Sequence, residues 1–172
     1  MVPALAGERT PTWDVTARGA VVGLDLDVDA ADLALAIYEG TALGLGDNIG
    51  RLQKVLGDLS PVRSVGGGSK SESWTQIKAD VLGVPVTVPR LGHGAAAGAA
   101  MLAGMATGLW PDEGSARALV AEEGSTFEPD PEMTDKYAER LELYRDLQGT
   151  LPPITRALHG PKHRRPPRQG AD

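Results

Sequence analysis

Cysteine is absent from this chain of 172 residues, and histidine occurs only three times. Without cysteine the chain forms no disulfide, offers no thiolate to a metal ion and has no thiol nucleophile. Three scattered histidines do not provide a zinc site, so we assign the chain no metal ligand. Aromatic residues make up only 4% of the sequence. The many glycines and alanines instead predict elements that pack closely on small side chains.

Long hydrophobic runs are also absent. No apolar run approaches the roughly 20 residues that span a bilayer, and residues 1–10 lack the basic start and apolar stretch of a signal peptide. These absences predict a cytoplasmic protein with no membrane partner. The formal net charge is −6, and basic side chains crowd into residues 162–168, so the body is more acidic still and we expect no nucleic-acid partner. The basic end favours a solvated tail over a contact with RNA or an acidic membrane.

The chain does contain alternating strand and helix signals. Residues 1–18 are loop-like, and residues 20–24 predict a short strand. A long helix is predicted from Asp29 as N-cap, with Asp32 in its first turn. Apolar residues follow the helical period and predict a face directed at a core: Leu33, Ile37, Leu45, Ile49, Leu52 and Leu56. Glycines within this helix predict close approach of another element: Gly40, Gly44, Gly46 and Gly50.

Shorter elements follow in alternation. A strand is predicted at residues 62–65, and a second helix starts at Ser69, which Glu72 follows three positions later. This helix is expected to bury Trp74, Ile77 and Val81 and to end at Gly83. The remaining predictions are a strand at 84–88, helices at 94–108, 112–123 and 133–148, and a connector at 127–131.

This alternation predicts an α/β fold with parallel strands joined by crossover helices. Three strands make a thin sheet for a free-standing domain, and the irregular start has no element to pack on. We therefore expect a fragment of a larger protein, with residues 1–150 forming part of one domain. Residues 151–172, rich in Pro, Arg, His and Gly, are predicted to form a disordered basic tail.

The most informative segment runs from Val65 to Ser71, between a predicted strand and a predicted helix. Glycines at such a junction let a ligand lie against bare backbone, and a nucleotide suits this geometry. The spacing matches neither the Walker A loop nor Gly-x-Gly-x-x-Gly. From the residues alone, a tight structural turn and a nucleotide-binding turn remain equally open. Gly66, Gly67, Gly68 and Ser71 are the candidate ligand-binding residues.

Other charged residues are weaker candidates. Glu8, Arg9 and Asp14 permit a catalytic pair, but a role in holding their loop against neighbouring backbone is favoured. His93 stands without a visible carboxylate or nucleophile partner, so we assign it no role. The Ala-rich stretch at 95–106 is too short for a membrane helix and predicts tight packing. We assign no catalytic residue.

Three segments in order carry a family resemblance: residues 7–19, the stretch from Gly66 through Trp74 to Val86, and residues 94–100. Together with Tyr38-Glu39-Gly40, they resemble the C-terminal part of an FGGY-family carbohydrate kinase, most closely xylulokinase. The resemblance covers about residues 1–150. It implies a partial ribonuclease H-like domain of the actin and hexokinase ATPase type, with a short, mainly parallel sheet. The N-terminal lobe and the first strands of the C-terminal lobe would be missing.

The resemblance also implies a function for the complete enzyme. That enzyme would transfer the γ-phosphoryl group of ATP to a sugar hydroxyl with Mg²⁺, and would form a homodimer. Gly66, Gly67 and Gly68 would form the floor of the adenosine site, with Ser71 near the adenine and Lys70 in solvent. ATP or ADP would bind here, whereas the sugar and the catalytic base would belong to upstream residues, so the fragment alone would be inactive. D-xylulose is the first expectation; gluconate, glycerol or another pentulose, and a non-catalytic nucleotide-binding or interaction module, remain open.

Overall fold

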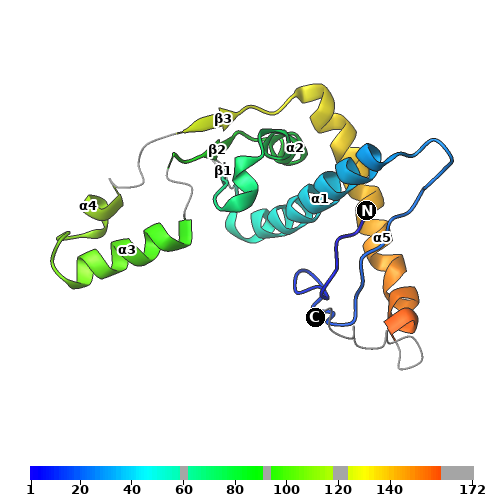
Figure 1. Cartoon of the computed structure of the whole chain (residues 1–172), viewed down its shortest axis with the longest axis horizontal. Helices are drawn as coiled ribbons and strands as arrows, with labels where there is room; N and C mark the ends of the chain where they lie inside the picture. Colours follow the sequence, from blue (N-terminus) through cyan, green and yellow to red (C-terminus); the bar gives the residue numbers. More distant parts are fainter. Residues whose placement is uncertain (59–61, 91–93, 118–123, 160–172) are drawn as a thin grey trace, which may run out of the picture.

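The computed structural model describes residues 1–58, 62–90, 94–117 and 124–159. Within them lie α1 (Ala30–Leu56), α2 (Glu72–Leu82) and α5 (Pro131–His159), which contact one another pairwise and form the body of the molecule. Figure 1 shows α3 (Gly94–Ala106) and α4 (Glu113–Arg117) extending away from this body. A small sheet lies between the two groups of helices.

The long helix α1 begins where the sequence predicted. The Asp29 side chain accepts hydrogen bonds from the backbone N–H groups of Ala31 and Asp32, and the Asp32 carboxylate accepts one from the N–H of Asp29 at 3.0 Å. This reciprocal capping box satisfies N–H groups that the first helical turn leaves without partners. The prediction of Asp29 as N-cap is confirmed.

The predicted buried face of α1 is wrong. Leu33, Ile37 and Leu56 are 39%, 46% and 66% exposed. The buried face consists mainly of small residues instead: Gly40, Ala42, Leu43, Gly46 and Asp47. Small side chains let α2 and α5 approach the α1 backbone, so close packing here depends on glycine and alanine rather than on the apolar period. The prediction that glycines permit close approach holds at Gly46, where an added Cβ would lie 2.9 Å from Cγ1 of Val81.

The sheet has the order β1-β2-β3 and is mixed rather than mainly parallel. Strand β1 (Val62–Arg63) pairs in parallel with β2 (Val86–Val88), and β2 pairs antiparallel with β3 (Ser125–Phe127). The sequence did not predict β3, whose end falls within the expected connector. The strand predicted at 20–24 is wrong, because with the residues that the structure describes its backbone makes only an isolated bridge, between Ala20 and Val2.

Helix α2 starts two residues later than predicted. A 3₁₀ turn, η1 (Gly67–Lys70), comes between the glycines and the helix, so the N-cap is Ser71 rather than Ser69. The helix ends as predicted at Gly83, which adopts a left-handed conformation with φ of 63°. Thr75, Lys78, Ala79 and Asp80 are its buried residues, whereas Ile77 and Val81 pack against the core while partly exposed.

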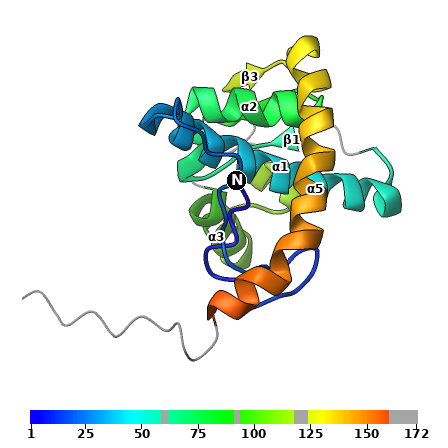
Figure 2. The same ribbon diagram turned by 90° about the vertical axis from the view of Figure 1, so that its right-hand side faces the viewer.

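Helix α5 extends beyond the predicted end at residue 148. It continues through Pro152 and Pro153 to His159, so the expected disordered tail does not begin at residue 151. Residues 160–172 lie outside the described part of the chain, as do His93 and the predicted helical residues 118–123. Figure 2 shows α5 bending near its C-terminal end, as expected where a proline removes a helical hydrogen bond.

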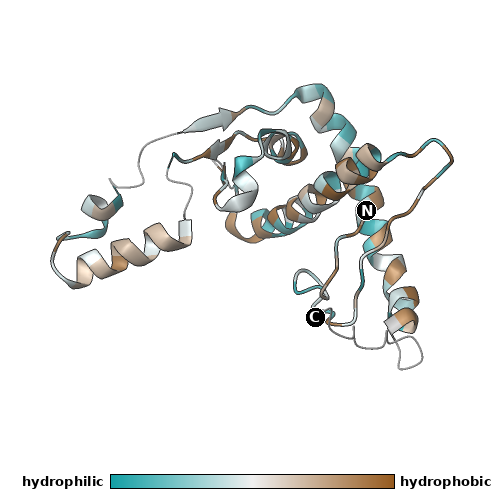
Figure 3. Cartoon of the chain, in the orientation of Figure 1, coloured by the Kyte–Doolittle hydropathy of each residue, from teal (hydrophilic) through white to brown (hydrophobic). Residues whose placement is uncertain are grey.

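The hydrophobic core is small and lies where α1, α5 and the N-terminal segment meet. Its buried members are Val2, Ala4, Ala17, Leu43, Tyr137 and Tyr144. Apolar colouring also covers α3 (Figure 3), whose Leu102 is exposed. Across the described residues, no helix combines the length and apolar character that crossing a membrane requires.

Candidate functional site

The glycine turn, residues 66–71, lies just after β1, at the carboxyl end of a parallel strand. In open α/β sheets, ligands bind outside the carboxyl ends of the strands. Gly66 has a φ of 95°, a conformation that side-chain-bearing residues rarely adopt, and it turns the chain from β1 into η1. The positive φ alone therefore requires glycine at this position.

Gly67 and Gly68 differ in their surroundings. An added Cβ on Gly67 would meet nothing within 4 Å, and Gly67 is exposed. A Cβ on Gly68 would lie 2.5 Å from Cζ3 of Trp74. Gly68 is thus required by packing beneath the turn, whereas Gly67 leaves open space above it.

Hydrogen bonds from small hydroxyl side chains hold the turn together. The buried Ser69 donates from Oγ to the Gly66 carbonyl at 2.7 Å, and its backbone N–H donates to the same oxygen at 3.2 Å. The buried Thr75 donates from Oγ1 to the Ser71 carbonyl at 2.9 Å. These bonds keep buried polar groups paired and tie the turn to the first turn of α2.

Ser71 caps α2, a role that the sequence analysis did not give it. Its Oγ accepts a hydrogen bond from the Trp74 backbone N–H at 3.3 Å. The hydroxyl proton remains available as a donor, so capping does not prevent Ser71 from contacting a ligand. Lys70 is exposed at the end of η1, as expected for a solvated side chain.

An apolar cavity of about 170 Å³ adjoins this strand end. Val65 and Pro89, which follow β1 and β2, line it together with Gly94, Ala97 and Met101 of α3. Gly94 matters here because an added Cβ would lie 2.9 Å from Cγ2 of Val65. The cavity and the glycine turn together offer an apolar recess beside open backbone, which suits a flat, partly apolar ring.

Lys78 is a buried cation beneath the turn. Its side chain packs over the Trp74 ring, with Nζ 4.2 Å from the ring centroid, and Nζ donates to Oγ of Ser64 at 3.4 Å. Burial lowers the pKa of Lys78, because removal from water disfavours the charged form. The sequence alone does not single out Lys78, since nothing in its helical spacing distinguishes it from a surface lysine.

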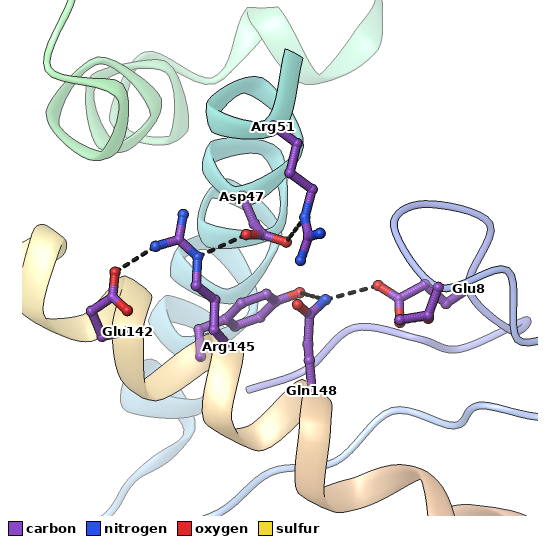
Figure 4. A network of polar contacts seen from close by, with 8 residues as sticks. Glu8, Asp47, Arg51, Glu142, Arg145 and Gln148 are labelled. Carbon is purple, nitrogen blue, oxygen red and sulfur yellow. Dashed lines mark hydrogen bonds and ion pairs between the residues drawn. The ribbon is translucent and has the colours of Figure 1, made fainter. Parts of the chain in front are cut away.

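A second polar cluster joins α1, α5 and the N-terminal loop (Figure 4). Asp47 is 1% exposed and accepts from Arg145 at 2.8 Å and from Arg51 at 3.0 Å. Burial alone would raise the pKa of Asp47, but the hydrogen bonds from Arg145 and Arg51 outweigh burial and hold it below its usual value. Arg145 also pairs with Glu142. This network is structural, because its charges are already paired with one another.

Glu8 and Asp14 hold the N-terminal loop as predicted, but their distant partners are side chains of α5 rather than neighbouring backbone. Gln148 of α5 donates to Glu8 at 2.8 Å, and Arg156 donates to Asp14 at 2.8 Å. The hydrogen bonds from Thr16, followed by those from Arg156, lower the pKa of Asp14 to about 2. Burial raises the pKa of Glu8. These contacts give both carboxylates a role in attaching the loop to α5.

A cavity of about 400 Å³ lies between this loop and α1. Its polar lining includes Glu8, Thr41, Asn48 and Tyr144, and Oδ1 of Asn48 is buried without a hydrogen-bond partner among the described residues. None of its lining residues belongs to the glycine turn. Within the described ranges, no group of three or more His, Cys, Asp or Glu residues lies close enough to hold a metal ion.

Comparison with known proteins places these features in a family. Residues 1–107 match the C-terminal domain of the FGGY family of carbohydrate kinases. Among curated relatives, a glycerol kinase of Nitratidesulfovibrio vulgaris is 43% identical over 114 residues, 66% of this chain and 23% of its own length. A xylulose kinase of Staphylococcus epidermidis is 31% identical over 156 residues, which cover 91% of this chain and 32% of the relative.

The fold shows the same relationship. The structure of a ligand-bound xylulose kinase from Lactobacillus acidophilus aligns with a TM-score of 0.74 and 30% identity, covering 87% of this chain and 30% of that chain. The prediction of an α/β fold of the actin and hexokinase ATPase type is confirmed. The chain spans about a quarter to a third of the length of these relatives.

Proposed function

Because the chain belongs to the FGGY family of carbohydrate kinases, we propose that it supplies part of the adenosine site of an ATP-dependent sugar kinase. Gly66, Gly67 and Gly68 form the backbone floor on which the nucleoside rests, and the Ser71 hydroxyl donates toward the adenine. The sugar and the catalytic base belong to the part of such an enzyme that this chain does not span.

One observation carries this proposal: the open space above Gly67 at the carboxyl end of β1. A turn that only reversed the chain would need glycine at Gly66, for its positive φ, and at Gly68, for the Trp74 ring. Gly67 has neither requirement, since its φ is not positive and an added Cβ would touch nothing. A ligand lying against the backbone accounts for the lack of a side chain there.

In the complete enzyme, ATP donates its γ-phosphoryl group to a sugar hydroxyl, and Mg²⁺ neutralises charge on the phosphates. The described residues fit the nucleoside end of ATP but bring no acidic cluster together for Mg²⁺. We therefore assign Mg²⁺ no ligand among the described residues and expect the chain alone to be inactive. The complete enzyme would be a cytoplasmic homodimer.

We favour D-xylulose as the sugar. The matching xylulose kinase of S. epidermidis covers 91% of this chain, whereas the glycerol kinase of N. vulgaris covers 66% at higher identity. The match to the xylulose kinase extends into α5, the helix that contributes Tyr137 and Tyr144 to the core. Glycerol and gluconate are the alternatives to test.

A non-catalytic nucleotide-binding or interaction module is the second candidate. Such a module would keep the glycine turn, which lies within the described residues, without the sugar site or the catalytic base. The two candidates differ in a reconstitution assay. Adding a separately expressed sugar-binding lobe from a xylulose kinase should restore ATP-dependent phosphorylation of D-xylulose, glycerol or gluconate only if the chain completes an enzyme.

Calorimetric titration of the chain with ADP tests the nucleotide site itself. We expect Gly67→Val to weaken ADP binding by at least about tenfold, roughly 1.4 kcal/mol, because the new side chain occupies the ligand's place. The thermal unfolding midpoint should change little, since an added Cβ meets no neighbour. Gly149→Ala is the matched control, because Gly149 also has open surroundings but lies in α5.

Two results would contradict the proposal. ADP binding that is equal in wild type and Gly67→Val would place the nucleotide elsewhere. No binding of ADP by the wild-type chain, combined with no activity on reconstitution, would leave the interaction module as the function.

A further inference from the structure

The Trp74 side chain touches three separate parts of the molecule. Its ring lies directly under Gly68 of the turn. It stacks on Tyr38 of α1, with ring centroids 5.5 Å apart and an interplanar angle of 12°. Lys78, one turn further along α2, places Nζ 4.2 Å from the Trp74 ring centroid. The ring therefore connects the glycine turn to the body of the molecule.

The contact with Gly68 leaves no space for a side chain. A Cβ there would lie 2.5 Å from Cζ3 and 3.2 Å from Cε3 and Cη2 of Trp74. These atoms form one edge of a rigid ring, which cannot yield as the end of a flexible chain can. The backbone at Gly68 thus rests on a fixed surface, and its height above α2 is set by the ring.

The ring is in turn held from α1 and from the strand end. Stacking with Tyr38 and the ammonium group of Lys78 each favour the observed ring orientation. Lys78 also donates to Oγ of Ser64, which follows β1, and the Ser64 backbone N–H donates to the Thr87 carbonyl of β2 at 2.9 Å. Movement of the ring would disturb contacts to α1 and to the sheet at once.

Hydrogen bonding does not explain the tryptophan. Its indole Nε1 is buried and has no hydrogen-bond partner among the described residues. A buried donor without a partner destabilises a protein, so shape must compensate. The side of the ring that meets Gly68 is the six-membered one, which extends beyond the reach of a phenylalanine or leucine at the same position.

We propose that Trp74 is a positioning residue for the glycine turn: its ring supports the Gly68 backbone and keeps Gly66 and Gly67 in the conformation that receives the nucleoside. Tyr38 and Lys78 hold the ring in place. As far as ligand affinity is concerned, this inference rests on the proposed adenosine site. The support of the turn by the ring does not depend on it.

Four versions of the full chain test this inference: wild type, Trp74→Leu, Gly68→Ala and the double variant. Amide hydrogen exchange across residues 66–71 is measured together with ADP affinity. We expect Trp74→Leu to speed exchange in the turn by about tenfold while exchange in α5 changes little, since local opening is separate from global unfolding. ADP affinity should fall by about threefold to tenfold.

The double variant provides the sharpest reading. Gly68→Ala alone should displace the turn, because its methyl group meets the Trp74 ring. In the Trp74→Leu background that collision is gone. The fold-increase in exchange and the fold-loss of ADP affinity caused by Gly68→Ala should therefore each be at least about threefold smaller there than in the wild-type background. Trp110→Leu is the matched control, because Trp110 also packs its ring against a glycine, Gly104 of α3.

The inference is overturned if Trp74→Leu leaves exchange in residues 66–71 at wild-type rates, if exchange rises equally in α5, or if the two substitutions are additive. An effect of Trp110→Leu on the turn as large as that of Trp74→Leu would also overturn it. If the wild-type chain binds no ADP, the exchange measurements still decide this inference, and only the proposed adenosine site fails.

Discussion

The crossing of α1 with α5 and the glycine turn after β1 use small residues in opposite ways. At the crossing, an added Cβ on Gly44 would lie 2.9 Å from the Tyr144 hydroxyl, so the glycine exists to admit a neighbour. At the turn, an added Cβ on Gly67 would meet nothing. A glycine whose missing side chain leaves room for a neighbour indicates packing, whereas the open Gly67 after β1 is what the proposed nucleoside site requires.

The two regions also differ in charge. At the crossing, the buried carboxylate of Asp47 is paired with two arginines, whereas the turn is formed by glycines, hydroxyl side chains and the exposed Lys70. Substitutions at the crossing should therefore change stability, and substitutions at the open glycine should change binding.

The largest effect is expected from Asp47→Asn. The substitution removes the charge that pairs with Arg51 and Arg145, and we expect the free energy of unfolding to fall by about 2–3 kcal/mol. The loss stays below the larger values known for buried pairs because both arginines are partly exposed and regain water. Urea unfolding measures it. ADP affinity of the folded protein should not change.

Acid dependence provides a second reading of the same substitution. Because the pKa of Asp47 is lowered in the folded protein, its stabilising contribution is present above its unfolded pKa of 3.8 and is lost as pH falls through the lower folded value. Wild type and Asp47→Asn should converge in stability at low pH. Glu142→Gln is the control, since Glu142 is 72% exposed and its ion pair should contribute under about 0.5 kcal/mol.

Gly46→Val should have a similar or slightly smaller effect. Its side chain would enter the space occupied by Cγ1 of Val81, and overpacking of this kind destabilises by about 1–3 kcal/mol. Thermal unfolding followed by circular dichroism measures the change. Gly149→Ala, which meets no neighbour, should instead stabilise α5 by about 0.5–1 kcal/mol. Equal effects of the two substitutions would contradict the packing role of Gly46.

The smallest effect concerns alkaline pH. Burial, followed by the charges of Glu8 and Asp47, raises the pKa of Tyr144 to about 12. A raised pKa gives stability that is complete below the unfolded value near 10 and is lost as pH rises through about 12. Tyr144→Phe should therefore lose less stability than wild type between pH 10 and 12, by about 1–2 kcal/mol in urea unfolding. Parallel pH profiles for the two proteins would contradict this assignment.

Local signals allowed much of the fold to be predicted. Asp29 and Gly83 were identified as helix boundaries because capping depends on residues close in sequence. The glycines of α1 predicted close approach for the same reason, since each lowers helix propensity without an evident local gain. The resemblance carried by residues 7–19, 66–86 and 94–100 supplied the fold family.

Features that depend on distant partners were missed. Residues 20–24 have a strand pattern, but in the described part of the chain the only bridge there joins Ala20 to Val2, whereas β3 is only three residues long and exists because β2 lies beside it. The inserted η1 moved the N-cap from Ser69 to Ser71. In the candidate site, Trp74 packs against Gly68 and Lys78 donates a hydrogen bond to Ser64, and spacing along the chain reveals neither contact.

The most direct test of the account is an NMR titration of the ¹⁵N-labelled chain with ADP. The account predicts that the largest amide shift changes fall within residues 66–71 and the start of α2, with small changes across the Asp47 network. Shift changes centred instead on the cavity lined by Glu8, Thr41 and Asn48, or no shift changes at all, would contradict it.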